Sequence, residues 1–128
     1  MPIAFWCLVA AWLWVYLSKG PVALAMHRLG GYDNHHPRAQ QAQLTGWGAR
    51  ALAAQANGFE TFPAFAAAVL SAHVLGGHAG LVSGLAVTFV VMRLAYTTLY
   101  IADLAAMRSL VWTVGWLATL GIFASPLF

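Results

Sequence analysis

Charged side chains are scarce in this chain. They make up 7% of its 128 residues, whereas roughly 25% is usual for a soluble domain, and hydrophobic residues make up 62%. A lipid bilayer requires such composition, because a spanning helix needs about 20 largely apolar residues. The scarcity of charge therefore excludes an ordinary soluble domain and indicates an integral membrane protein in contact with lipids.

Cysteine is almost absent as well. The single Cys7 excludes an internal disulfide and leaves the redox compartment open. The five histidines have no metal-ligand spacing with a carboxylate, because His35 and His36 are adjacent in a polar stretch and His73 and His78 lie far from them. Basic residues interleaved with aromatic ones are also lacking. We therefore expect no metal site and no nucleic-acid partner.

Four stretches are long and apolar enough to span a bilayer: residues 3–26, 47–75, 81–102 and 104–127. They use nearly the whole chain, so we predict one domain, residues 1–128, with an all-α fold of four transmembrane helices. The first stretch lacks the basic start of a secretory signal and is expected to be a retained helix.

The connections and helix boundaries carry their own signals. Lys19-Gly20-Pro21 should kink the first helix near its end. Within the longest connection, residues 30–46, the segment 30–37 is dense in turn formers and is predicted to be a loop. We expect the second helix to begin near Thr45 or Gly46.

Basic residues fix the expected orientation. Lys19, Arg28, Arg38 and Arg50 flank the first connection and Arg108 adjoins the third, while the second connection and both termini have no Lys or Arg. By the positive-inside rule, the first and third connections are cytoplasmic and both termini face outward.

Polar residues within the second apolar stretch mark a candidate site. At about 100° per residue, Asn57 lies about 20° from Arg50 around the helix and Glu60 about 80° from it, so the three are predicted to converge. A charge at bilayer depth costs about 2.5–3.5 kcal/mol, so such residues are expected to have partners or ligands. Gln55, about 140° from Arg50, is expected to contact another helix.

A second polar stripe lies on the third stretch. Arg93, Tyr96 and Tyr100 are spaced by three and four residues and share one face of a helix. The second and third helices run antiparallel through a short turn, so Glu60 and Arg93 reach comparable depth. We predict that these two residues pair as counter-ions.

These residues form a recognisable pattern. It reads Asn57-x-x-Glu60-x-x-Pro63-x-Phe65, then Arg93-x-x-Tyr96-x-x-x-Tyr100, then Arg108-Ser109. With the loop at residues 33–38, the pattern resembles the small bacterial branch of the MAPEG superfamily, the membrane-associated proteins in eicosanoid and glutathione metabolism. The resemblance covers essentially the whole chain.

The resemblance implies a homotrimer of four-helix subunits in the bacterial inner membrane. Glutathione would be the co-substrate, bound between neighbouring subunits in the cytoplasmic half of the membrane. Asn57 and Glu60 would hold the backbone and amino group of the tripeptide, and Arg93, Tyr96 and Tyr100 its carboxylates.

The resemblance also implies the residues near the sulfur. Arg108, with Ser109 beside it, would face the thiol, and Arg28 is a looser match to a basic residue contributed across the interface. A free thiol with a pKa near ~8.5 is only slightly ionised at neutral pH, and a guanidinium beside it favours the thiolate. A role for Arg108 as a cytoplasmic topology anchor stays open.

One position departs from the family pattern. Relatives usually carry an arginine four residues before the asparagine, and this chain has Ala53 there, with Arg50 one turn earlier. Either Arg50 substitutes along the same face, or the thiol site has been lost or repurposed.

Three functions follow from these patterns. The first is a glutathione-dependent transferase or peroxidase acting on hydrophobic electrophiles or lipid hydroperoxides. The second is a non-catalytic trimeric membrane protein of the same fold. The third, a small multidrug-type transporter, needs a carboxylate in its first helix, and this first helix has none.

Overall fold

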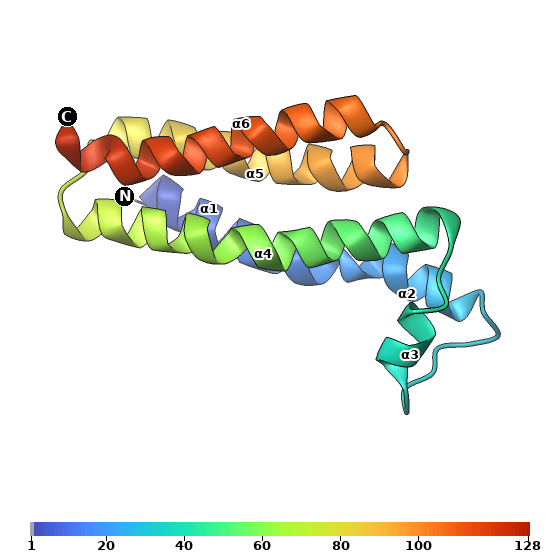
Figure 1. Ribbon diagram of the computed structural model, residues 1–128. Coiled ribbons are helices and arrows are strands. Elements are labelled where there is room, and N and C mark those ends of the chain that lie inside the picture. Colours follow the sequence, from blue (N-terminus) through green and yellow to red (C-terminus); the bar gives the residue numbers. More distant parts are fainter. Residues whose placement is uncertain (1) are drawn as a thin grey trace.

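The computed structural model describes residues 2–128, and the secondary structure found there is helical. The elements are α1 (Pro2–Leu17), α2 (Lys19–His27), α3 (Pro37–Gln41), α4 (Gly46–Val74), α5 (Ala79–Ile101), α6 (Ala105–Ala124) and the 3-10 helix η1 (Ser125–Leu127). The long helices run along one common axis (Figure 1). The predicted all-α class is confirmed.

The two ends of this helix bundle differ in what they carry. One end has α2, α3, the start of α4 and the α5–α6 turn, and the other has the start of α1, the α4–α5 turn and the C-terminus (Figure 1). We call the former the α3 end. The basic connections of the sequence therefore meet at one end of the molecule.

Helices α1 and α2 follow one another with a break at Ser18, close to the predicted kink. Pro21 has no backbone N–H to donate to the carbonyl of residue 17, so a continuous helix would lose one hydrogen bond here. At the break itself, the Ser18 hydroxyl donates to the Val15 carbonyl at 2.9 Å. The two helices together still form one apolar segment, Pro2–His27.

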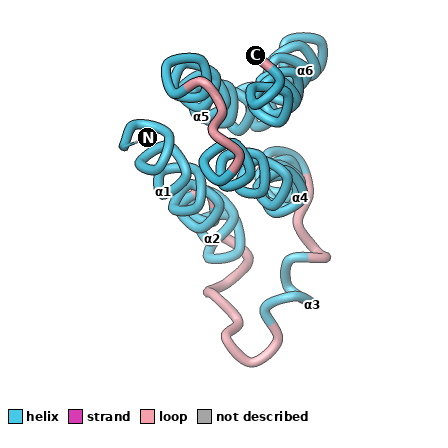
Figure 2. The backbone as a smooth tube through the Cα atoms, turned by 90° about the vertical axis from the view of Figure 1, so that its left-hand side faces the viewer, coloured by secondary structure: helices cyan, strands magenta, loops and turns pink. Residues whose placement is uncertain are grey.

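The connection between α2 and α4 contains a short helix, α3, which was not predicted; residues 30–36 before it are non-helical, as predicted, and α3 begins at Pro37, the last residue of the predicted loop. The Gln40 side chain anchors it by donating to the carbonyls of Met26 at 3.2 Å and Gly31 at 2.7 Å. Helix α3 projects from the bundle, in the connection that leads from α2 to α4 (Figure 2). Its five residues are too few for a periodic signal, and Pro37 at its start is the one local indication.

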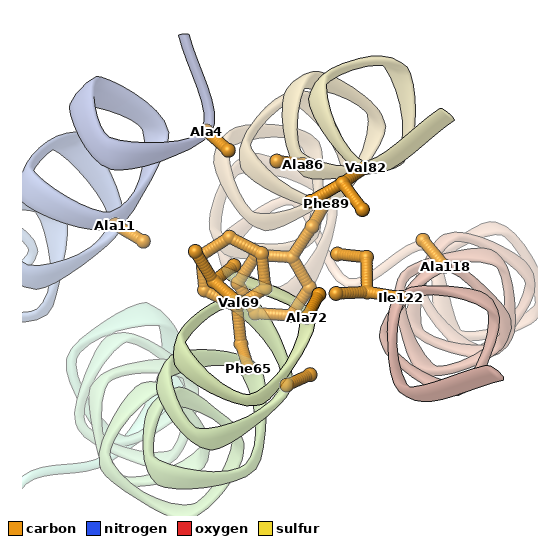
Figure 3. Close-up of a cluster of buried hydrophobic side chains, with 11 residues drawn as sticks. Ala4, Ala11, Phe65, Val69, Ala72, Val82, Ala86, Phe89, Ala118 and Ile122 are labelled. Atoms are coloured by element: carbon orange, nitrogen blue, oxygen red, sulfur yellow. The ribbon is translucent and has the colours of Figure 1, made fainter. Parts of the chain in front are cut away.

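The main core lies between α1, α4, α5 and α6 and consists largely of small side chains. Phe65 from α4 and Phe89 from α5 stack at its centre, with ring centroids 3.9 Å apart and planes 6° apart (Figure 3). At Gly121 of α6, an added Cβ would lie 2.8 Å from Leu85 Cδ1 of α5. Small residues therefore set the close approach of these helices, as is usual between helices in membranes.

Three helical segments within residues 2–128 are long and apolar enough to cross a membrane: Pro2–His27, Ala79–Ile101 and Ala105–Leu127. Many large apolar side chains on them are exposed, as contact with lipid requires. Helix α4 is the longest at 29 residues but is not among the three, because its polar stripe lowers its hydropathy. Three of the four predicted stretches therefore have the length and hydropathy of a membrane span as helices of this structure.

Helix α4 begins at Gly46, directly after Thr45, as predicted. It continues without interruption past Pro63 and reverses into α5 through a short turn. Helix α4 packs against α1, α2, α5 and α6, while α5 packs against α1, α4 and α6. This packing places the polar stripes of α4 and α5 side by side.

Candidate functional site

The polar stripes of α4 and α5 meet through Asn57. Its side-chain oxygen accepts an N–H from Arg93 Nη1 at 2.9 Å, and its side-chain nitrogen donates to Glu60 Oε2 at 3.2 Å. Asn57 and Glu60 lie one turn apart on α4, which brings both onto the face that meets α5. The three side chains form one continuous hydrogen-bonded chain, which we call the Asn57 relay.

This geometry corrects the predicted direct pairing of Glu60 with Arg93. Within residues 2–128, no oxygen of Glu60 lies within 4.0 Å of a guanidinium nitrogen. Asn57 lies between the two groups, since its amide has both an acceptor and donors. Arg93 is 7% exposed whereas Glu60 is exposed, so the cation is buried and the carboxylate is open to a ligand.

A cavity of about 400 Å³ opens beside the Asn57 relay, between α4, α5 and α6. Asn57, Glu60 and Arg93 form its polar part. The rest of its lining is mainly apolar and comes largely from α6: Thr61, Ala64, Phe89, Val111, Trp112, Gly115, Trp116, Thr119, Leu120 and Phe123. Its volume lies in the range of about 300–1,000 Å³ that small-molecule sites occupy. The cavity therefore suits a ligand that places a charged group at the polar part and an apolar group against the rest of the lining.

A second, more polar cavity of about 270 Å³ lies toward the α3 end, between α5 and α6. Its lining is Tyr96, Tyr100, Arg108, Ser109, Trp112 and Thr113. Trp112 lines both cavities. Four of the predicted site residues, from two helices, therefore share one cavity next to the first.

Aromatic rings hold the two guanidinium groups of these cavities. The Arg93 Cζ atom lies 4.3 Å from the ring centre of Tyr96, and Arg108 Cζ lies 4.3 Å from that of Tyr100. The Tyr96 and Tyr100 rings contact each other edge to face, with centroids 5.6 Å apart. Such contacts are worth about 0.5–1 kcal/mol each at exposed sites and more when desolvated, and they fix where each cation points.

Arg50 does not join the Asn57 relay. Its Nε donates to the Ile101 carbonyl at 3.1 Å, at the last residue of α5, and Arg50 lines neither cavity. The predicted convergence of Arg50 with Asn57 and Glu60 is therefore corrected to the latter two. The reason is axial distance, because seven residues of helix separate Arg50 from Asn57 by about 10 Å.

Two other predicted residues lie outside both cavities. Gln55 is buried and donates to the Val15 carbonyl at 3.4 Å, which confirms its predicted contact with another helix. Arg28 is exposed at the end of α2, with its guanidinium 5.5 Å from the ring centre of Trp47. Within one subunit, the Arg28 side chain thus contacts Trp47 at the α3 end of the bundle.

Sequence reasoning missed the aromatic part of the cavities. Trp112 and Trp116 are four residues apart on α6 and follow Arg108 at the same interval. This spacing places all three on one face of the helix, and it is the signal that identifies them. Among the described residues, no three His, Cys, Asp or Glu side chains gather closely enough to hold a metal ion.

Comparison with protein families gives a match over nearly the whole chain. The model of the MAPEG family matches residues 3–128. The chain belongs to the MAPEG family. It is therefore an integral membrane protein related to glutathione and eicosanoid metabolism, as the sequence pattern indicated. Neither the curated proteins nor the solved structures include a match to it.

Proposed function

We propose that this MAPEG protein is a glutathione-dependent membrane enzyme, a transferase or peroxidase that acts on hydrophobic electrophiles or lipid hydroperoxides. The observation that carries the proposal is the pair of adjoining cavities. One offers a buried guanidinium and an exposed carboxylate beside an apolar wall, and the other offers Arg108 above Tyr100. Family membership supports the same class of co-substrate.

The residues present fit a zwitterionic thiol peptide. Asn57 takes one N–H of the Arg93 guanidinium, which has five, so the others remain for a carboxylate. Glu60 receives one hydrogen bond, from Asn57, and is exposed, so it can accept from an ammonium group. Asn57, Thr61 and Ser109 line these cavities and offer polar side chains to the amide groups of the peptide.

Arg108 supplies the chemistry. Its guanidinium, held over the ring of Tyr100, favours the thiolate form of a sulfur placed next to it. In the transferase reaction the thiolate forms a sulfur–carbon bond as the leaving group departs from the electrophile. In the peroxidase reaction two thiols reduce a hydroperoxide to an alcohol and water and become a disulfide. The apolar wall on α6 would receive the hydrophobic substrate.

The proposed enzyme is a single domain, residues 1–128, with four spanning helices in a bacterial inner membrane. Helix α4 would then cross the membrane as well. Its 29 residues exceed the roughly 20 that a span needs, and it packs against the three apolar segments. The positive-inside rule, applied to Lys19, Arg28, Arg38, Arg50 and Arg108, supports a cytoplasmic position for the α3 end. The cavity beside Arg108 would then lie in the cytoplasmic half of the membrane, whereas the cavity beside the Asn57 relay would begin near mid-depth, because its residues on α6 run from Val111 to Phe123.

We further propose a homotrimer, because the exposed Glu60 and the cavity beside it would otherwise face lipid. A neighbouring copy would close this side and bring its Arg28 to the site. We expect native mass measurement in mild detergent to give three chains per particle. Cross-linking that yields only monomers or dimers at every concentration would contradict the proposal.

The enzyme function is tested with purified wild-type protein. We expect glutathione to raise the thermal unfolding midpoint, and the protein to conjugate glutathione with a chlorodinitrobenzene or to reduce a lipid hydroperoxide. Protein heated above its unfolding midpoint gives the uncatalysed rate. Absence of both binding and turnover in a folded sample would refute the proposal.

One observation favours the alternative of a non-catalytic membrane protein of this fold. Position 53 is alanine, and Arg50 is bonded to the Ile101 carbonyl rather than to the Asn57 relay. Binding of glutathione without turnover of either substrate class would support this alternative.

A further inference from the structure

A third cavity lies inside the subunit, on the α1 side of Arg93. It has a volume of about 10 Å³ and lies between α1, α4 and α5, and Thr61, Phe89 and Arg93 separate it from the larger cavity by lining both. Every residue that lines it is buried or half-buried within one subunit. The properties of this small cavity therefore do not depend on a neighbouring copy of the chain.

A donor and an acceptor border the small cavity without a direct hydrogen bond between them. The Arg93 guanidinium has five N–H groups and is 7% exposed, and within residues 2–128 its one hydrogen-bond acceptor is Asn57 Oδ1, which serves Nη1. The Thr61 hydroxyl donates to the backbone carbonyl of Asn57 at 3.0 Å, so the lone pairs of its oxygen are left to accept. The Trp14 indole N–H also borders the cavity, but it already donates to Thr97 Oγ1 at 3.2 Å.

Gly58 of α4 creates the space next to the guanidinium. A Cβ atom at this position would lie 3.7 Å from Val15 Cγ2 and 4.0 Å from Arg93 Nη2, which are ordinary contact distances. Alanine would therefore fit, and its methyl group would fill part of the small cavity. Glycine is less favourable than alanine inside a helix, so the close packing of helices does not explain why position 58 is glycine.

We propose that the small cavity binds one ordered water molecule, which accepts a hydrogen bond from Arg93 Nη2 and donates one to Thr61 Oγ1. A buried water needs a volume of about 10–15 Å³ and two to four polar partners, and this cavity offers both. The water gives the buried cation an acceptor on the α1 side, in addition to Asn57. The guanidinium is thus held on two sides, with three N–H groups left for a ligand in the larger cavity.

Gly58→Ala tests the proposal because the two states of the cavity predict opposite signs. With a water present, the methyl group displaces it and leaves Arg93 Nη2 and Thr61 Oγ1 without a partner, so the unfolding midpoint should fall below that of the wild type. In a dry cavity, the methyl group would fill a void and favour the helix, so the midpoint would rise. Gly84→Ala on α5 is the matched control, because its added Cβ meets nothing within 4 Å. A midpoint for Gly58→Ala at or above that of Gly84→Ala would overturn the proposal.

The Arg93→Met background separates loss of the water from steric strain. Without the guanidinium there is no charged donor for the water to satisfy, so Gly58→Ala should no longer lower the midpoint relative to its own parent. A decrease of the same size with and without Arg93 would contradict the proposal, because it would then come from the methyl group alone.

A crystal structure of the wild-type protein that resolves buried water gives the direct test, including where a variant does not fold. We expect one density peak within about 3.2 Å of both Arg93 Nη2 and Thr61 Oγ1, and no such peak in Gly58→Ala. No peak at this position in the wild type, with other buried waters resolved, would refute the proposal. None of these measurements uses turnover, so the inference and the proposed enzyme function can fail independently.

Discussion

Arg108→Ala is expected to raise the pKa of the bound thiol and to lower turnover at neutral pH while most glutathione binding is retained. In the proposed enzyme the guanidinium would stabilise the thiolate but not the neutral thiol, whereas Glu60 and Arg93 would hold the rest of the ligand in both forms. A shift of one pKa unit corresponds to about 1.4 kcal/mol. The acidic limb of the pH profile of kcat should therefore move upward by about one unit or more.

Tyr100 provides an internal check on this prediction. The guanidinium of Arg108 lies over its ring, so the ring rather than the hydroxyl positions the cation. Tyr100→Phe should keep the wild-type pH profile, and Tyr100→Leu should move it in the same direction as Arg108→Ala. Arg38→Ala, which removes a charge outside the cavities, should leave the profile in place. An unshifted profile in Arg108→Ala would show that Arg108 does not act on the thiol.

The positions of the long helices could be predicted because they depend on local signals. Thr45-Gly46 begins α4, Pro21 breaks the first apolar segment close to Ser18, and the glycines at residues 76 and 77 end α4. Helix α3 was missed because five residues carry no period, and its anchor, Gln40, bonds to residues up to 14 positions away. Contacts of that kind depend on how the chain returns on itself.

The candidate site was predicted in its residues but not in its contacts. Angular position around α4 correctly placed Asn57 and Glu60 together, because they are one turn apart. The same angle wrongly added Arg50, because it ignores the distance along the helix axis. The predicted direct Glu60–Arg93 pair was wrong for another reason. Equal depth in the membrane does not determine which side chain lies between two charged groups, and here Asn57 lies between them.

The apolar wall of the larger cavity shows a further limit of sequence reasoning. Trp112, Trp116 and Leu120 repeat every four residues on α6, which is as typical of a lipid-facing stripe as of a ligand site. Only the packing of α6 against α4 and α5 decides that this face borders a cavity. The polar groups of the candidate site could therefore be predicted from the sequence, whereas the shape of the cavity could not.

Asn57→Leu is expected to destabilise the protein more than any other single change in the relay, by about 3 kcal/mol. The change leaves the Arg93 guanidinium in a position where it is 7% exposed, without its hydrogen-bond acceptor, and an uncompensated buried charge is costly. Adding Arg93→Met to Asn57→Leu should restore part of the loss, because the unpaired charge is then gone. The double variant should thus have a higher unfolding midpoint than Asn57→Leu alone.

Two further variants make this order of stabilities decisive. Glu60→Gln should change the unfolding midpoint little, because Glu60 is exposed and a side-chain oxygen that can accept from Asn57 remains. Thr98→Val, on the exposed face of α5, removes a hydroxyl bonded within its own helix and should stay within about 0.5 kcal/mol of the wild type. If Arg93→Met lowered stability equally with and without Asn57, the two side chains would be energetically independent. The relay would then contribute nothing to holding α4 against α5, whereas a hydrogen bond to a charged donor between membrane helices should couple them by about 1–2 kcal/mol.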